Sequence, residues 1–249
     1  MQVNIKTPEE VKIMAEGGKK LSIVKNQLIE AVKVGVSAAE IEKMATEGII
    51  AQGGSPSFKM VPDYFWTTCI NVNDGIVHGI PHKDLIFQEN DVVSVDLGMF
   101  YKGFHTDTSF SVYLGKDPKI VEMLAVGKKA LKNAIGEAAV GNLMADISYA
   151  IEKTLESGKL NPVESLVGHG VGRALHEYPP IPCFVTGARS EQIEIQQGFV
   201  LAIEVMYTQG NPELVTDSDG WTIRTKDGKI SALFEETVAV TADGPLILT

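Results

Sequence analysis

The spacing of apolar residues along the chain predicts four helices and two groups of strands. Thr7-Pro8-Glu9-Glu10 has the cap, first-turn proline and glutamate of a helix start, and Ser37-Ala38-Ala39-Glu40 is a second start of this kind. In chain order, the predicted elements are a helix after Thr7, a helix from Ser37 to near Gly53-Gly54, strands from about Ile70 to Tyr113, a helix from Asp117-Pro118, a helix from Ala145 to Ser157, and further strands after Gly158. Because no linker or low-complexity segment interrupts this order, the pattern indicates an α+β chain.

The stretch from Val92 to Tyr113 alternates between apolar and polar residues as an antiparallel hairpin does. A turn at Tyr101 and Lys102 places Asp96 opposite Asp107. The apolar face carries Val93, Val95, Leu97, Met99, Phe104 and Phe110, and the polar face carries Ser94, Asp96, His105, Asp107 and Ser109. Like charges that face each other destabilise a strand pair, so a shared proton, basic neighbours, water or a cation must offset the repulsion. The ordinary alternative is a solvated polar face on a half-exposed sheet.

The second half of the chain repeats short segments of the first half. Three pairs of segments match in the same order and at a nearly constant separation: VGVSAAEI with VGNLMADI, HGIP with HEYP, and VVSVDL with FVLAIEV. Such self-similarity predicts an internal duplication within one domain of residues 1–249, with halves of roughly 1–115 and 116–249. A pseudo-twofold axis between the halves is expected to bring Asp96 and Glu204 together across it.

Four acidic residues stand in strand-like apolar sequence, and one glycine-flanked histidine precedes the second pair: Asp96, Asp107, Glu204, Glu235 and His169. Clustered carboxylates cannot be both ionised and dry without cations. Two divalent ions fit such a cluster, and their shared water is expected to be hydroxide at neutral pH. A single imidazole among oxygen donors favours Mn, Fe, Co or Zn and leaves the choice among them open.

Bulk composition limits the partners and the compartment. The chain has 249 residues, of which 44% are hydrophobic, and a formal net charge of −10. This acidic balance, with a pI near 5.0, argues against nucleic acid or an anionic membrane as a partner. No apolar run approaches the length of a membrane span and the N-terminus lacks a signal-peptide core, so a cytoplasmic location is expected. Cys69 and Cys183 are too few for a disulfide framework and are expected to be reduced thiols.

Several motifs together resemble the methionine aminopeptidases of the short bacterial type I form. The matching segments are NDGIVHGIP, VVSVDLGMFYKGFHTDTSF, SLVGHGVGRALHEYPPIP, GFVLAIEVM, DGWTIRTKDGKISALFEETVAV and LILT. The resemblance runs from about Lys6 to Thr249. It implies the pita-bread fold, in which two pseudo-twofold-related halves form a central antiparallel sheet covered by helices. It also implies removal of the initiator methionine from new chains whose second residue is small.

The resemblance assigns roles to individual residues. It implies that Asp96, Asp107, His169, Glu204 and Glu235 hold two divalent ions, with Glu204 also the general base. It implies that His78 and His176 bind substrate and take part in catalysis. Cys69, Tyr64 and Trp221 are expected to line the methionine pocket. Met206, Phe65 and Trp66 are further candidates for its walls. The partners expected are the N-termini of nascent polypeptides, with the enzyme a monomer associated with the ribosome.

Four departures from the family pattern concern this site. Glu236 stands where a histidine usually follows the last ligand, and it is expected to add a negative charge beside the metals. Val205 replaces a common proline, Leu175 replaces an aromatic residue, and the segment before Cys69 differs. Methionine is therefore expected to remain the preferred first residue, with weaker discrimination against leucine or norleucine than in a typical member and no preference for proline in second place.

Other functions are less consistent with the sequence. GHGVGR lacks the strand, spacing and distant acid of a dinucleotide fingerprint, and HEYPP lacks the second histidine of a helical zinc-protease motif. An Xaa-Pro aminopeptidase of the same fold usually has an additional N-terminal domain, and a non-catalytic binding module of this fold usually loses ligands.

His105 is expected to be structural, and His82 is expected to be solvated.

Overall fold

The structure is a computed structural model that describes residues 2–187 and 193–249. Its α-helices are α1 (Pro8–Ala31), α2 (Ala38–Ala51), α3 (Pro118–Glu137) and α4 (Met144–Ser157). Both predicted capping boxes are present. The Thr7 and Ser37 hydroxyls accept the N–H groups of Glu10 and Glu40, whose carboxylates accept the cap N–H groups in return. These reciprocal bonds fix where α1 and α2 begin, which confirms the two predicted helix starts.

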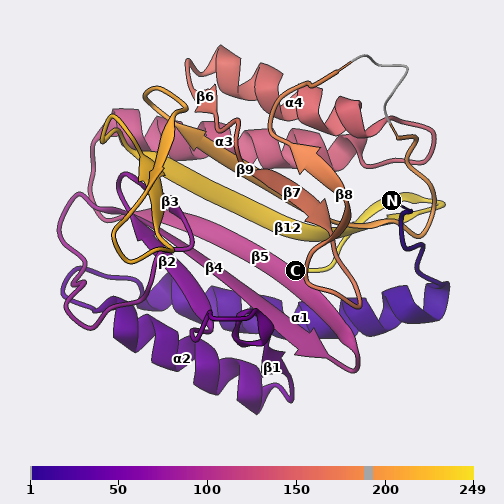
Figure 1. Cartoon of the computed structure of the whole chain (residues 1–249), viewed down its shortest axis with the longest axis horizontal. Helices are drawn as coiled ribbons and strands as arrows, with labels where there is room; N and C mark the ends of the chain where they lie inside the picture. The colour runs from indigo at the N-terminus through magenta and orange to yellow at the C-terminus, as the bar shows by residue number, and fades with distance from the viewer. Residues whose placement is uncertain (1, 188–192) are drawn as a thin grey trace.

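The strands form one large sheet and one small sheet (Figure 1). The strands are β1 (Ser55–Pro56), β2 (Thr68–Val72), β3 (Gly75–Val77), β4 (Val92–Tyr101), β5 (Phe104–Tyr113), β6 (Asn161–Pro162), β7 (Val167–Gly170), β8 (Glu177–Pro182), β9 (Val200–Thr208), β10 (Leu214–Thr216), β11 (Ile223–Thr225), β12 (Ser231–Thr241) and β13 (Gly244–Ile247). The large sheet has the order β1-β4-β5-β12-β9-β7-β8, with β2, β13 and β6 paired to β4, β12 and β9. Its pairs are antiparallel, and the small sheet has the order β10-β11-β3.

The hairpin of β4 and β5 exists, but its predicted register is wrong by two residues. Asp96 lies opposite Ser109, and Asp107 lies opposite Gly98. The turn is centred on Lys102 and Gly103, whose φ angles of 47° and 92° both lie in the left-handed region that glycine readily adopts. A shift of two residues preserves the face of every side chain. Asp96 and Asp107 therefore still share one face, as diagonal neighbours and not as a directly opposed pair.

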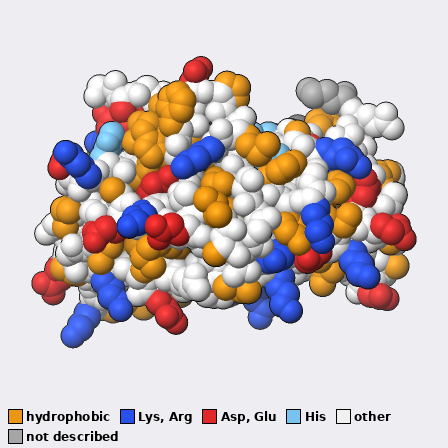
Figure 2. Space-filling model, turned by 90° about the horizontal axis from the view of Figure 1, so that it is seen from below, with side chains coloured by type: hydrophobic (Ala, Val, Ile, Leu, Met, Phe, Trp, Pro, Cys, Tyr) orange, Lys and Arg blue, Asp and Glu red, His pale blue; other side chains and the backbone are white. Residues whose placement is uncertain are grey.

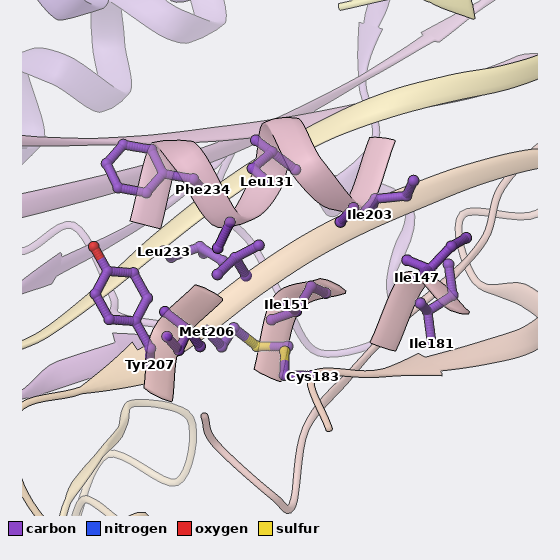
Figure 3. Packing of buried hydrophobic residues seen from close by; sticks show 14 of the residues in the cluster. Leu131, Ile147, Ile151, Ile181, Cys183, Ile203, Met206, Tyr207, Leu233 and Phe234 are labelled. Atoms are coloured by element: carbon purple, nitrogen blue, oxygen red, sulfur yellow. The ribbon is translucent and has the colours of Figure 1, made fainter. Parts of the chain in front are cut away.

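All four helices cover the same face of the large sheet. Helix α1 packs against β4 and β5, and α2 packs against α1, β1 and β2, with a buried cluster that includes Leu21, Ile41 and Val95. Helix α3 packs against β9 and β12, and α4 packs against α3, β6 and β8, with a second cluster that includes Leu131, Ile151 and Ile203 (Figures 1 and 3). The even-numbered residues of β4 point away from the helices, which leaves their polar side chains on the opposite face.

The seam between the two helix-covered parts of the sheet lies between β5 and β12. Only two residue pairs are in register there, Glu235 with Ser109 and Glu236 with Thr108. Side-chain hydroxyls extend the junction. Thr237 Oγ1 accepts the Asp107 N–H and donates to the Asp107 carbonyl, both at 2.8 Å, and Ser111 Oγ donates to the Leu233 carbonyl at 2.7 Å. These hydroxyls replace main-chain bonds where the two strands diverge.

This arrangement corrects one expectation about the two halves. The strands that meet at the seam are β5 and β12, whereas β4 and β9, which carry Asp96 and Glu204, flank that pair. Their strands therefore do not pair with each other, but the side chains of Asp96 and Glu204 still line the same cavity across the seam. The internal duplication of residues 1–115 and 116–249 stays a prediction.

The surface carries mixed charge, and the described residues include no helix long and apolar enough to cross a membrane. On the face seen in Figure 2, acidic and basic side chains are interspersed with hydrophobic ones. Neither charge forms a continuous area on that face.

A glycine substitution tests how closely α1 approaches the end of the chain. A Cβ atom at Gly18 would lie 2.4 Å from the Leu248 carbonyl oxygen, whereas a Cβ atom at Gly136 in α3 would meet nothing within 4 Å. Gly18→Ala is expected to lower the free energy of unfolding by about 1–3 kcal/mol because backbone must move. Gly136→Ala is the matched control and is expected to raise it by about 0.4–1 kcal/mol. Chemical denaturation measures both, and equal effects would contradict the close approach.

Candidate metal centre

The candidate ligands lie on the sheet face that the helices leave open, in two adjacent rows of side chains. The first row crosses β2, β4, β5, β12 and β9 and consists of Cys69, Asp96, Ser109, Glu235 and Glu204. The second row crosses β4, β5, β12, β9 and β7 and consists of Gly98, Asp107, Thr237, Ala202 and His169. Residues directly opposite each other in neighbouring strands project from the same face. Five strands therefore bring the five predicted metal ligands to one place.

All ten predicted site residues line a single cavity of about 90 Å³. They are Tyr64, Cys69, His78, Asp96, Asp107, His169, His176, Glu204, Trp221 and Glu235. The structure thus brings together the candidate ligands, the two candidate substrate histidines and the candidate pocket residues. Among the residues that the structure describes, no lysine or arginine lines this cavity.

Burial raises the pKa of every carboxyl in the cluster, and repulsion from other carboxylates raises three of the four further. Burial is the largest cause at each position. It raises the pKa of Asp96 to about 7. The pKa values of Asp107, Glu204 and Glu235 lie well above the ordinary range, because each also faces the charge of other carboxylates in the cluster. Without a compensating positive charge, this cluster therefore retains protons at a pH where free carboxyls have lost them.

The atoms of the cluster fit a divalent cation. Ligand atoms of Asp107, His169 and Glu235 all lie within 4.8 Å of one another. Three buried polar atoms in the first row have no hydrogen-bond partner: Asp96 Oδ1, Glu235 Oε1 and Ser109 Oγ. Buried acceptors without partners are costly, and a cation between the rows would satisfy the two carboxylate oxygens. Hard oxygen donors with one imidazole suit Mn, Fe, Co or Zn.

His169 is oriented to offer a lone pair to the cluster. Its Nδ1 lies 2.9 Å from the Gly170 carbonyl oxygen, which can only accept, so Nδ1 carries the proton. Burial, followed by repulsion from His176, lowers the pKa of His169 to about 4, so the ring is neutral near pH 7. Nε2 then has a free lone pair, 3.5 Å from Glu204 Oε1. A backbone carbonyl that fixes the tautomer in this way is typical of metal-binding histidines.

His78 follows β3 and is held in a left-handed conformation, with φ of 58°. The next residue fixes that geometry. The Gly79 N–H donates to Asn71 Oδ1 at 3.0 Å, the Gly79 carbonyl accepts the Ile70 N–H at 2.8 Å, and a Cβ at Gly79 would lie 2.1 Å from the Ile70 carbonyl oxygen. Asn71 was missed at the sequence level, because only the close approach of the two segments reveals its role.

His176 immediately precedes β8 and is positioned by a buried ion pair. Glu177 forms a 2.6 Å ion pair with Lys6 and accepts the Ala174 N–H at 3.1 Å, which fixes the loop. The rings of His176 and His169 have centroids 4.5 Å apart at 77°. Burial lowers the pKa values of His176 and His78, so both are neutral at pH 7 and can donate one N–H each.

An apolar wall closes the other side of the cavity. Tyr64 and Trp221 stack edge to face with centroids 5.0 Å apart, and the Tyr64 hydroxyl lies 3.2 Å from Cys69 Sγ. Leu175 completes the wall. Phe58, Val61 and Val77 also line it and were missed, since nothing in their local sequence marks them as different from core residues.

Three candidates for this wall do not line it. Met206 is buried next to Cys183 (Figure 3), and Phe65 is 72% exposed. Trp66 packs edge to face on Tyr64 with centroids 5.3 Å apart and does not itself line the cavity. Val205 is fully buried in the same core as Met206. Of the candidate wall residues, Cys69, Tyr64 and Trp221 are the ones that line the cavity.

Glu236 does not face the cavity, but its charge still acts on the cluster. Glu235 faces the cavity, so the next residue of β12 faces the helices. The Glu236 carboxylate forms an ion pair with Lys25 of α1 at 2.7 Å. After burial and the charges of the other three carboxylates, the Glu236 charge is the smallest cause that raises the pKa of Glu235, so the expected negative charge acts from the opposite side of the sheet.

The two remaining histidines lie outside the cavity. His105 is buried, with Nδ1 2.9 Å from Ser57 Oγ and its ring packed on Phe100. His82 is exposed. Cys69 and Cys183 are both buried free thiols, as expected.

An antiparallel sheet that holds a carboxylate cluster and one imidazole beside an apolar cavity defines a metal-dependent hydrolase of the pita-bread fold. Residues 12–242 match the model of metallopeptidase family M24. The chain belongs to this family.

Relatives of known name match over the whole chain. It is 37% identical to the methionine aminopeptidase of Aquifex aeolicus, covering 100% of this chain and 99% of the relative, and 36% identical to methionine aminopeptidase 1 of Bacillus subtilis, covering 98% of each. The crystal structure of the methionine aminopeptidase of Thermotoga maritima superposes with a TM-score of 0.96 at 36% identity, covering 100% and 99% of the chains. The prolidase of Pyrococcus furiosus has a TM-score of 0.75 at 22% identity, with 98% of this chain and 65% of the prolidase covered, which shows the shared fold.

The raised carboxyl pKa values predict an inverted pH dependence of stability. A folded state that keeps protons longer than the unfolded chain loses stability as pH rises from about 4 through 7. Asp96 alone, with a pKa of about 7 against an ordinary 3.8, contributes on the order of 4 kcal/mol to this loss. In chelator-treated protein, the melting temperature is therefore expected to fall between pH 5 and pH 8. Saturating Mn²⁺ is expected to remove most of that fall, and Asp96→Asn to reduce it; identical pH profiles with and without the ion would contradict the cluster.

Proposed function

We propose that the chain is a methionine aminopeptidase that removes the initiator methionine from nascent proteins and peptides with a small second residue. The observation that carries this proposal is the convergence of five candidate ligands and two neutral histidines on one cavity with an apolar wall. The names of the full-length relatives support the same activity. A divalent cation bound there would lower the pKa of a coordinated water and polarise the scissile carbonyl.

Each group around the cavity has a chemical task in this proposal. Asp96, Asp107, His169, Glu204 and Glu235 would hold two divalent ions, and Glu204 would take the proton of the attacking water. His176 would donate its N–H to the carbonyl oxygen as negative charge develops there, and His78 would bind the peptide next to the cleaved bond. Both histidines can do so because their lowered pKa values keep them uncharged donors.

The apolar wall would select the first residue of the substrate. Tyr64, Cys69, Trp221 and Leu175 surround a space suited to an unbranched thioether. Leu175 stands where relatives of the type I form usually have an aromatic residue. The smaller, more flexible leucine would make the cavity larger and more easily deformed. The same proposal includes a cytoplasmic location and a monomeric enzyme that meets nascent chains at the ribosome.

A peptide panel tests the proposed activity. With Mn²⁺, Fe²⁺, Co²⁺ or Zn²⁺ supplied, Met-Ala-Ser is expected to have the highest kcat/KM. Leucine and norleucine analogues are expected to follow within about 10–200-fold, since one methylene changes binding by about 1–3 kcal/mol. Leu175→Phe is expected to widen that gap. If Xaa-Pro peptides were cut fastest, an Xaa-Pro aminopeptidase would be the better assignment; if no peptide were cut, a binding module would be.

A histidine variant separates catalysis from metal binding. His176→Ala removes one donor to the developing oxyanion and is expected to lower kcat by about 10²–10³-fold. Its metal content should equal that of the wild type. Asp107→Ala is the contrasting variant, expected to lose both turnover and bound metal. Loss of metal in His176→Ala would make that residue a ligand instead.

A further inference from the structure

A buried ion pair lies directly behind the candidate metal centre, on the helix-covered face of the sheet. Lys25 Nζ of α1 lies 2.7 and 2.8 Å from the two carboxylate oxygens of Glu236. Both side chains are mostly buried, with 10% and 21% of their surface exposed. Such a pair joins residues 211 positions apart, and removing one partner leaves an uncompensated charge in the interior.

Two threonines connect this pair to the backbone of the ligand residues. Thr108 Oγ1 accepts a bond from Lys25 Nζ at 3.0 Å and donates to the Glu235 carbonyl at 2.9 Å. Thr249 Oγ1 donates to Glu236 Oε2 at 2.7 Å and accepts the Thr237 N–H at 2.9 Å. We refer to Lys25, Glu236, Thr108 and Thr249 as the rear clamp.

The rear clamp acts where the main-chain ladder between two long strands is short. The strands β5 and β12 have only two residue pairs in register, at Ser109–Glu235 and Thr108–Glu236. Thr237, which Thr249 fixes, binds the N–H and the carbonyl of Asp107 through its own hydroxyl. The backbones of Asp107 and Glu235 are thus both held from behind, across the seam that the two carboxylates must span to share an ion.

We propose that the rear clamp positions Asp107 and Glu235 and thereby sets the affinity of the site for its divalent ions. This inference rests on the proposed metal centre. Groups that orient ligands through hydrogen bonds typically change metal affinity by about 10–100-fold when they are removed. The clamp does not contact the cavity, so its removal should leave peptide binding intact.

Calorimetric titration of chelator-treated protein with Mn²⁺ measures the effect. Lys25→Met is expected to weaken Mn²⁺ affinity by about 10–100-fold, with KM for Met-Ala-Ser unchanged at saturating Mn²⁺. Lys19→Met, which removes an exposed charge from the same helix, is the matched control and is expected to bind as the wild type does. In Lys25→Met/Glu236→Gln the buried unpaired charge is gone, and affinity is expected to recover in part.

A milder pair of variants tests the clamp without removing a charge. Thr249→Val deletes the hydroxyl that bonds both Glu236 and the Thr237 N–H, at similar volume, and is expected to weaken Mn²⁺ affinity by about 2–10-fold. Thr249→Ser should restore it. If Lys25→Met and Thr249→Val melt at lower temperature and yet bind Mn²⁺ as tightly as the wild type, the clamp is only structural and the inference fails. If the wild type itself binds no divalent ion, the proposed function fails first.

Discussion

Repulsion among four mostly buried carboxylates is the constraint on which the rest of this structure depends. Asp96, Asp107, Glu204 and Glu235 share one sheet face, and no lysine or arginine among the described residues lines their cavity. Burial raises all four pKa values, and the charge of neighbouring carboxylates raises those of Asp107, Glu204 and Glu235 further. Bound cations can relieve this repulsion, and His169 is held neutral with its lone pair directed at the cluster. Because no lysine or arginine side chain compensates these carboxylates, the metal-free protein is expected to lose stability as the pH rises.

The two faces of the sheet have different roles. The helix-covered face packs against the helices through large apolar clusters. On the open face, the two rows combine the candidate ligands with small residues such as Gly98, Ser109 and Ala202, and a separate apolar cluster that includes Tyr64 and Leu175 lies beside them. The ion pair between Lys25 and Glu236 lies on the helix-covered face, behind the candidate ligands.

Much of this organisation could be predicted from local sequence. Period-two alternation identifies Asp96 and Asp107 as neighbours on one face, and the helix starts at Thr7 and Ser37 follow from their capping boxes. The hairpin register could not be predicted, because it depends on which residues take left-handed conformations in the turn. The partner of Glu236 and the support of His78 by Asn71 also escape prediction, since tertiary packing alone brings those residues together.

Five side chains, each from a different strand, are proposed to form one dinuclear metal centre. A crystal structure of the protein grown with Mn²⁺, with anomalous scattering recorded at the manganese edge, tests it most directly. Two anomalous peaks about 3.5–4 Å apart are expected between the rows, within bonding distance of Asp96, Asp107, His169, Glu204 and Glu235. Peaks elsewhere, or none at this site in protein that cleaves Met-Ala-Ser, would contradict it.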